Sequence, residues 1–422
     1  MGNLISRRNY LTEFESACGN GNRLRMDGLK TAPQTERKDR FVELPTRMIL
    51  TGSGLALLRK AGTPVVRVLN RDGIQREGLE SPRFNAGTIQ KMVMNSYIEE
   101  IFAPVPDLLS RRYHVISTNN LIVYAILYKK LSPSLAKTMF ETNVVREFNR
   151  KNPKNSIVEL KQIPTQTAET LKKAKADHFK KLEAELQQSV SNLIRKNPAL
   201  SDEDRRSMVL SLPKFLAWID TRIWYLYYVI YLSGYREQMR NVFSRVLAQY
   251  LDHTRIATHL SNLLMEFVQN AEKAHLERII VKGGFAPRNQ VDKYLRNREN
   301  RQMVIGAAAK ARQLLDLSWN MNPERMSVGQ QYRIQISISN FGIIDDRVRL
   351  DLAKKMKTNV DGIRISDFYT GGDDPEKLGA GLGLLYNSYL EDICKNEGIQ
   401  YRCNIYPEPA KEKTTVRIEI SL

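Results

Sequence analysis

The segment LLMEFVQNAEKAH (263–275) constrains the fold of this chain more than any other. Its apolar side chains recur at three- and four-residue steps, a period that predicts one amphipathic helix. Glu266, Asn270 and Lys273 fall together on another face of that helix, because residues three and four apart are neighbours on a helix surface. A carboxylate, an amide and an amine in one row make a candidate site for a metal ion and phosphate oxygens.

Two later segments combine a regular pattern with glycine. RIQISISNFG (333–342) alternates apolar and polar residues, as a strand does, and then breaks at Asn340 and Gly342. Glycine lets a backbone approach a phosphate closely, and a helix N-terminus offers unpaired N–H groups to an anion. Both features are expected in LGAGLGLLYNSYLEDICK (378–395), where a helical run follows Gly379, Gly381 and Gly383.

In this order the three segments resemble the N, G1 and G2 boxes of the GHKL ATPases, a superfamily that includes sensor histidine kinases and DNA gyrase. Phe368, in DFYTGGDD, is similar to the family's F box. The resemblance covers about residues 255–422. It implies a C-terminal α/β sandwich of the histidine-kinase ATPase type, with ATP and Mg²⁺ as ligands.

The resemblance implies a role for each matching residue. Asn270 is expected to bind the Mg²⁺ that bridges the ATP phosphates, and Glu266 to polarise a water molecule or the phosphoacceptor. Lys273 is expected to reach the phosphates as a point charge. The alternatives are an exposed helix carboxylate at Glu266 and a solvated surface lysine at Lys273. The loop that closes over the triphosphate is expected to contain Gly379, Gly381 and Gly383.

The middle segment departs from the family pattern Asp-x-Gly-x-Gly. Asn340 stands where the family's Asp accepts a hydrogen bond from the adenine amino group, Gly342 keeps the first glycine, and Ile344 replaces the second. An asparagine carbonyl still accepts that bond, but without charge, which predicts weaker adenine binding. Ile344 cannot adopt backbone angles that only glycine tolerates, so we expect a different loop path.

Periodicity and composition divide the whole chain, which we expect to be an α+β protein. The expected parts are a mobile basic tail (1–40), a mainly helical N-terminal domain of unknown function (41–151), a linker (152–166), a helical, dimerisation-hairpin-like region (167–262) and the ATP-binding domain (263–422). Residues 63–73 are predicted to be a strand that ends in a turn, residues 88–149 to be mainly helical, and residues 414–422 to be a strand that completes the C-terminal sheet.

The region 167–262 is predicted to hold two long helices, the first over 167–196 and the second from about 213. Two helices ahead of a GHKL domain are similar to the dimerising hairpin of sensor kinases, so we expect a homodimer whose leucine-rich stripes pack together. His178 lies on the first helix and is the candidate phosphoacceptor. The acid and proline that follow such a histidine in the family are missing, and the alternative is a polar surface residue.

Two further stretches flank the middle segment. Residues 281–332 form a long basic insert, predicted as a loop and then a helix. It is either a lid or docking helix particular to this protein or a surface elaboration. Residues 345–378 occupy the place of the family's mobile ATP lid.

The formal net charge of +19 is unevenly distributed. Residues 1–250 contain 40 Lys and Arg against 24 Asp and Glu, a difference of +16, whereas residues 251–422 contain 25 against 22, a difference of +3. The excess therefore belongs to the front of the chain. Such a charge attracts anionic partners such as nucleic acid, anionic lipid or an acidic protein, with a solvated basic surface as the alternative.

The sequence also favours a cytoplasmic location. Cys18, Cys394 and Cys403 are too few and too scattered for a disulfide framework, which indicates a reducing compartment. The apolar run IWYLYYVIYL (223–232) is short of the roughly 20 residues that a membrane-spanning helix needs. We therefore expect no transmembrane segment, and a buried helix at 223–232.

The expected function is that of a bacterial, histidine-kinase-like protein that binds Mg-ATP and transfers its γ-phosphate in two-component signalling. A response regulator or another protein is the expected partner. We expect the kinase branch because the ATP-binding segment comes last in the chain, whereas gyrase-type proteins place it early. The alternative is a non-kinase GHKL ATPase that acts as an ATP-dependent switch and holds a partner. Serine kinase activity is a third candidate.

Overall fold

The computed structural model describes residues 41–70, 73–198, 200–321, 332–344, 346, 349–350 and 382–422. They form two compact units. We call residues 124–256 the helical unit, and residues 41–123 together with 257–422 the sheet unit. The expected basic tail (1–40) and most of the expected lid (345–378) lie outside the described residues.

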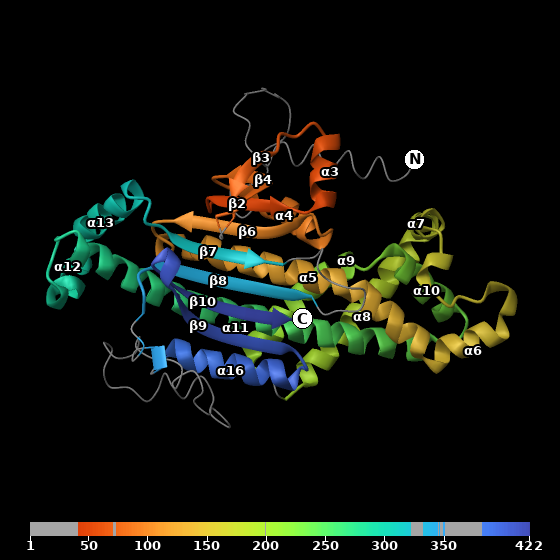
Figure 1. Cartoon of the computed structure of the whole chain (residues 1–422). Helices are drawn as coiled ribbons and strands as arrows, with labels where there is room; N and C mark the ends of the chain where they lie inside the picture. Colours follow the sequence, from red (N-terminus) through yellow and green to blue (C-terminus); the bar gives the residue numbers. More distant parts are fainter. Residues whose placement is uncertain are drawn as a thin grey trace, which may run out of the picture. The chain divides into compact units, whose positions relative to one another are not determined.

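The strands of the sheet unit form one antiparallel sheet of eight strands, in the order β3-β4-β2-β6-β7-β8-β10-β9 (Figure 1). A second, two-stranded sheet pairs β1 with β5. The strands are β1 (Phe41–Val42), β2 (Thr46–Leu50), β3 (Val66–Leu69), β4 (Gln75–Ser81), β5 (Phe84–Asn85), β6 (Ile98–Val105), β7 (Leu315–Asn320), β8 (Arg333–Phe341), β9 (Gln400–Glu408) and β10 (Lys413–Ser421).

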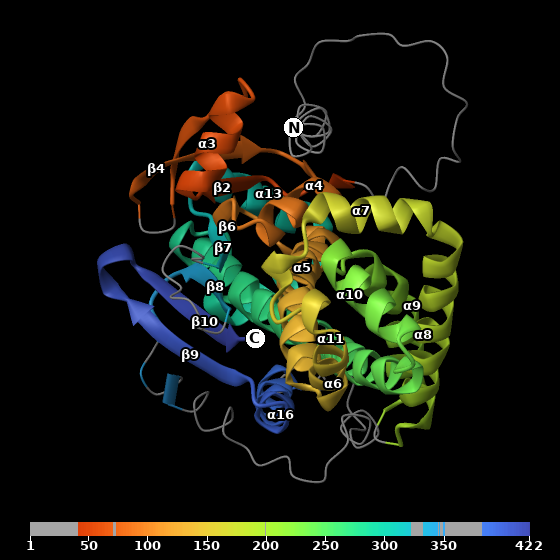
Figure 2. The same ribbon diagram turned by 90° about the vertical axis from the view of Figure 1, so that its right-hand side faces the viewer.

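Helices of the sheet unit include the first part of α5 and the last part of α11, which run along one face of the large sheet (Figures 1 and 2). Among the described residues of this unit, five shorter α-helices accompany them. The bounds are α3 (Gly52–Lys60), α4 (Ala86–Met94), α5 (Arg112–Glu141), α11 (Arg236–Lys282), α12 (Val291–Arg296), α13 (Arg298–Lys310) and α16 (Leu382–Asn396).

The core of the sheet unit lies between this face and the helices. Strand register places Trp319, Ile336 and Ile418 in one row, and all three are buried. Trp319 Nε1 donates to Asn119 Oδ1 on α5 at 3.2 Å, and Asn119 Nδ2 donates to Ser261 Oγ on α11 at 2.8 Å. Because buried polar groups need hydrogen-bond partners, this chain of bonds fixes both helices against the middle of the sheet.

The helical unit packs the remaining parts of α5 and α11 with α6 (Asn143–Lys151), α7 (Thr165–Ala174), α8 (Ala176–Lys196), α9 (Asp202–Ala217) and α10 (Thr221–Leu232). Its core contains several large aromatic side chains beside the aliphatic ones, and each aromatic buries a large apolar area. Trp224 and Tyr227 on α10 are fully buried, and the Tyr227 ring lies 4.3 Å from that of Phe243 on α11. The predicted buried helix at 223–232 is thus confirmed.

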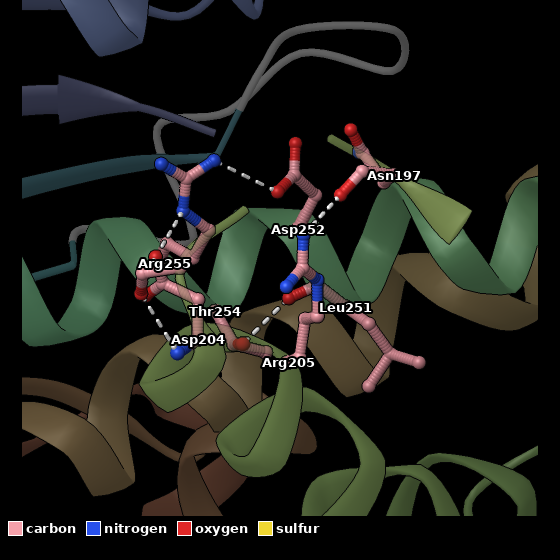
Figure 3. A network of polar contacts seen from close by, with 8 residues as sticks. Asn197, Asp204, Arg205, Leu251, Asp252, Thr254 and Arg255 are labelled. Atoms are coloured by element: carbon pink, nitrogen blue, oxygen red, sulfur yellow. Dashed lines mark hydrogen bonds and ion pairs between the residues drawn. The ribbon is translucent and has the colours of Figure 1, made fainter. Parts of the chain in front are cut away.

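A polar network in the helical unit ties the start of α9 to α11 (Figure 3). Arg255 on α11 lies 3.6 Å from an oxygen of Asp204 and donates to Asp252 at 3.1 Å. Arg205 donates to the backbone oxygen of Asn197, which follows α8, at 2.9 Å. Carboxylates in the first turn of α9 also complement the positive end of the helix dipole.

The structure confirms the α+β class and corrects several details of the N-terminal half. Residues 88–149 are mainly helical, as predicted, but a strand interrupts the helices: α4 ends at Met94, Ser96 has a positive φ of 57°, and β6 follows. β6 lies inside the sheet with most of its residues buried, so its apolar run favours a strand. The expected linker 152–166 contains two short 3-10 turns and the buried Ile163.

The prediction of a two-helix hairpin over residues 167–262 is also wrong. Between residues 165 and 282 the chain forms five helices, and the first predicted helix breaks at Lys175, which has φ −117° and ψ 33°. The apolar stripe of α8, expected to face a twin subunit, is buried inside this chain at Phe179, Leu182 and Leu186. That stripe is therefore not available for the expected dimer contact.

The boundary expected at 262/263 does not separate two sheets. β7 pairs with β6, so strands from both ends of the chain belong to one sheet. The expected insert 281–332 includes β7 as well as helices α12 and α13. The predicted strands at 63–73, 333–342 and 414–422 are confirmed as β3, β8 and β10. None of the helices in the described ranges has the length and apolarity needed to cross a bilayer.

Candidate functional site

The predicted polar row lies on α11, as the 3.6-residue period requires. Asn270 and Lys273 are exposed, and Glu266 is half-buried. Burial raises the pKa of Glu266, and the charge of Arg112 lowers it. Val268, on the apolar side, is fully buried. The helix thus presents a carboxylate, an amide and an amine along one accessible face.

Past β8, the chain turns against one side of this helix. His275 Nδ1 accepts a hydrogen bond from the backbone N–H of Phe341 at 3.2 Å, and its Nε2 lies 3.2 Å from the oxygen of Gln313. Nδ1 is therefore the acceptor and Nε2 carries the proton. Burial lowers the pKa of His275 to about 4, so the ring is neutral at physiological pH.

Gly342 begins this turn with a φ of +109°, a backbone angle that side chains disfavour. A Cβ atom at this position would also overlap the Arg278 side chain. Arg278 extends from α11 across the glycine and donates to the oxygen of Ile343 at 2.7 Å. The backbone angle therefore requires glycine here, and any side chain would also displace the arginine that covers it.

β10 holds the other side of the same turn. Thr414 Oγ1 accepts from the Ile344 N–H at 2.8 Å and donates to the oxygen of Gly342 at 2.6 Å. The Gly342 N–H donates to the oxygen of Glu412 at 2.6 Å. Because the backbone N–H groups of both Gly342 and Ile344 are hydrogen-bonded, the turn keeps a defined path with isoleucine at position 344.

Asn340, the candidate adenine ligand, lies on the helix-facing side of β8. Side chains alternate along a strand, so Asn340 shares a face with Ile336 and Ile338. It is 8% exposed, and its Nδ2 donates to the oxygen of Phe341 at 3.3 Å. The amide nitrogen is therefore engaged by the backbone, and Oδ1 is the acceptor that it can offer to a ligand.

Helix α12 of the insert flanks the other side of α11. Lys273 Nζ lies 3.2 Å from Asp292 Oδ1, and Glu277 Oε1 lies 3.3 Å from Arg288 Nε. A small apolar cluster beneath these pairs joins the insert to the end of α11. Its members are Leu276, Ile279, Ile280, Val291, Val304, Ile305 and Ala308. The exposed face of α11 thus has the Gly342 turn on one side and α12 on the other.

Sequence reasoning missed a further polar group, Glu272, on the buried side of α11. It accepts hydrogen bonds from the backbone N–H groups of Leu108 and Leu109 at 2.8 and 3.0 Å, and it pairs with Arg301 of α13. Burial raises the pKa of Glu272 to about 7, and these partners oppose that effect. The sequence did contain a signal for this burial. Glu272 lies four residues from Val268 and four from Leu276, so it shares the apolar face of the helix with both.

The remaining candidate residues lie elsewhere. Gly383, expected in a loop, falls in the first turn of α16, whereas Phe368, Gly379 and Gly381 lie outside the described residues. His178 is exposed on α8 in the helical unit. Within the described ranges, no group of three or more His, Cys, Asp or Glu side chains is placed to hold a metal ion. An ion at Asn270 would therefore depend on ligand oxygens from elsewhere, such as phosphates.

Fold and site together define an α+β protein in which a polar helix face adjoins a fixed glycine turn. The chain belongs to a family of unknown function, DUF8084, which it matches over residues 37–422. It is also similar to an uncharacterized protein of Treponema pallidum (strain Nichols), with 24% identity over 390 residues, or 90% of this chain and 98% of that protein. No solved structure matches.

Proposed function

We propose that the sheet unit binds Mg-ATP in the manner of the GHKL ATPases. One observation carries the proposal: α11 and the turn after β8, distant in sequence, meet through the His275–Phe341 and Arg278–Ile343 hydrogen bonds. The segments that resemble the N and G1 boxes are thereby neighbours in space. In this arrangement Asn270 holds the Mg²⁺, and Asn340 accepts a hydrogen bond from the adenine amino group.

The proposed reaction is transfer of the γ-phosphate to a protein histidine, with a signalling role in the bacterial cytoplasm. Such transfer depends on positioning and on neutralising the charge of the phosphates, which Mg²⁺ supplies when bound. Glu266 orients the acceptor, and its half-buried carboxylate lies one helical turn from Asn270. His178 is the proposed acceptor because it is exposed on its helix. The proposed partners are a response regulator and a second copy of the chain.

A second candidate function is an ATP-dependent switch without phosphoryl transfer. The observation that favours it is the packing of α8: the apolar side of the helix that carries His178 is buried within the chain, at Phe179, Leu182 and Leu186. This helix is therefore part of a folded unit and lacks the free stripe of a dimerising hairpin. In the switch, nucleotide binding changes the shape of the protein, and a partner is held or released.

Calorimetric titration with Mg-ATP tests the proposed nucleotide site. Asn270→Ala should abolish the magnesium-dependent part of binding, because it removes the only expected protein ligand of the ion. Gln269→Ala is the matched control, since Gln269 is the exposed neighbour on the same helix and should leave affinity unchanged. Equal affinities of wild type and Asn270→Ala for Mg-ATP would contradict the site.

A further inference from the structure

Arg278 is the side chain that connects α11 most directly with the Gly342 turn. Its guanidinium crosses the face of Gly342 and donates to the Ile343 oxygen at 2.7 Å. The Arg278 side chain is half-buried, whereas its hydrogen bond to Ile343 is exposed to solvent. Arg278 lies two helical turns beyond Asn270 on the same helix, outside the segment that resembles the N box.

The turn that Arg278 covers follows Asn340 directly. Asn340 Nδ2 donates to the Phe341 oxygen at 3.3 Å, so the orientation of its amide depends on the path of the backbone after β8. If that path is fixed, Oδ1 faces the ligand as an acceptor. If the path relaxes, the amide can rotate and offer its NH₂ group instead.

We infer that Arg278 is a positioning residue that sets base selectivity, holding the turn so that Asn340 presents an acceptor to a 6-amino purine. This inference rests on the proposed function. A 6-amino purine, such as adenine, donates at that position, whereas a 6-oxo purine, such as hypoxanthine, accepts there. A fixed Oδ1 therefore favours the first base and rejects the second.

The turn has other attachments that should preserve the fold when Arg278 is changed. Thr414 bonds both Gly342 and Ile344, and His275 bonds Phe341. Loss of the guanidinium therefore removes one of several connections. The expected consequence is altered selectivity at the base, with the phosphate contacts of the exposed α11 face unaffected.

The test compares Mg-ATP with Mg-inosine triphosphate, which carries the same ribose and triphosphate but a 6-oxo base. Wild type should bind ATP more tightly. Arg278→Ala should weaken ATP binding by roughly threefold to tenfold, which is the loss expected for one hydrogen bond. Binding of inosine triphosphate should stay unchanged, so the preference for ATP disappears. Arg278→Lys should restore part of it. Arg245→Ala is the control, because Arg245 lies on the same helix and donates to Asn241 within that helix.

Three results would overturn the inference. The first is an unchanged ATP preference in Arg278→Ala, and the second is an equal loss for both nucleotides, which would mark a purely structural residue. The third is a wild type that binds both nucleotides equally, which would show that Asn340 does not select the base. If Arg278→Ala does not fold, Arg278→Lys tests the inference instead, through the partial loss of ATP preference expected for it. A wild type that binds neither nucleotide would instead refute the proposed function.

Discussion

At the scale of single residues, the proposed role of Asn340 depends on the contacts of its side-chain amide. The amide donates to the Phe341 oxygen at 3.3 Å, which a carboxylate cannot do. Asn340→Asp should bind Mg-ATP several-fold more tightly, because charge-assisted hydrogen bonds are roughly twice as strong as neutral ones. The nucleotide-free protein should lose about 1 kcal/mol of stability, since two acceptors then face each other.

Calorimetry with Mg-ATP and thermal unfolding without nucleotide measure the two effects separately. Tighter binding together with a lower melting temperature is the expected combination. Weaker ATP binding in Asn340→Asp would show that this side chain does not face adenine.

His275 makes the stability of the protein depend on pH. Its pKa is lowered from 6.5 to about 4 in the folded protein, so the unfolded chain binds its proton first as the pH falls. Stability from this residue is therefore fully present above pH 6.5 and is lost as the pH falls towards 4, at up to about 1.4 kcal/mol per pH unit. In His275→Gln this contribution disappears, while a side-chain oxygen can still accept from Phe341.

Urea unfolding between pH 4.5 and 7 measures this contribution as the difference in slope between wild type and His275→Gln. The raised pKa of Glu272, about 7, gives the opposite slope in the same window. Both proteins retain Glu272, so the difference isolates His275. Parallel curves would show that burial does not keep the His275 ring neutral.

At the scale of elements, periodicity predicted α11, β8, α10 and β10 correctly, because each has one apolar face or a fully apolar run of the right length. It failed for β6, whose apolar residues suit a buried strand and a helix equally. The sequence also indicated Glu266 and Asn270 through their spacing. It could not indicate the contacts of Glu272 or Arg278, because these depend on segments 164 and 65 residues away.

Helix α8 decides between the two proposed functions. If the protein is an autokinase, His178→Gln should erase an acid-labile label from γ-labelled ATP and leave ATP binding intact, because His178 is exposed on α8, outside the proposed nucleotide site. His114→Gln is a matched control on α5, outside the proposed acceptor helix. A label that persists in His178→Gln places the acceptor elsewhere, and an unlabelled wild type favours the switch.

At the scale of the whole molecule, strands from both ends of the chain share one sheet, which limits the fragments that can fold alone. The segments that resemble the GHKL boxes all lie within residues 255–422, but the strands of the large sheet do not. In the structure β7 pairs with β6, and Glu272 on α11 bonds the backbone at Leu108 and Leu109. The family match over residues 37–422 also includes both units.

A fragment of residues 255–422 should therefore fail to form a stable fold. It would expose the edge of β7, whose residues Leu315 and Leu317 are fully buried in the intact protein, and an unpaired apolar edge favours aggregation. It would also leave the Glu272 carboxylate without its backbone donors, at a cost of about 1–3 kcal/mol. Residues 37–422 are the matched control, since they keep every strand of the part of the chain that the structure describes, and they should melt cooperatively like the full chain. Circular dichroism melting and the dispersion of amide NMR signals measure whether each fragment folds. A cooperative transition in the 255–422 fragment would show that the pairing of β7 with β6 is dispensable.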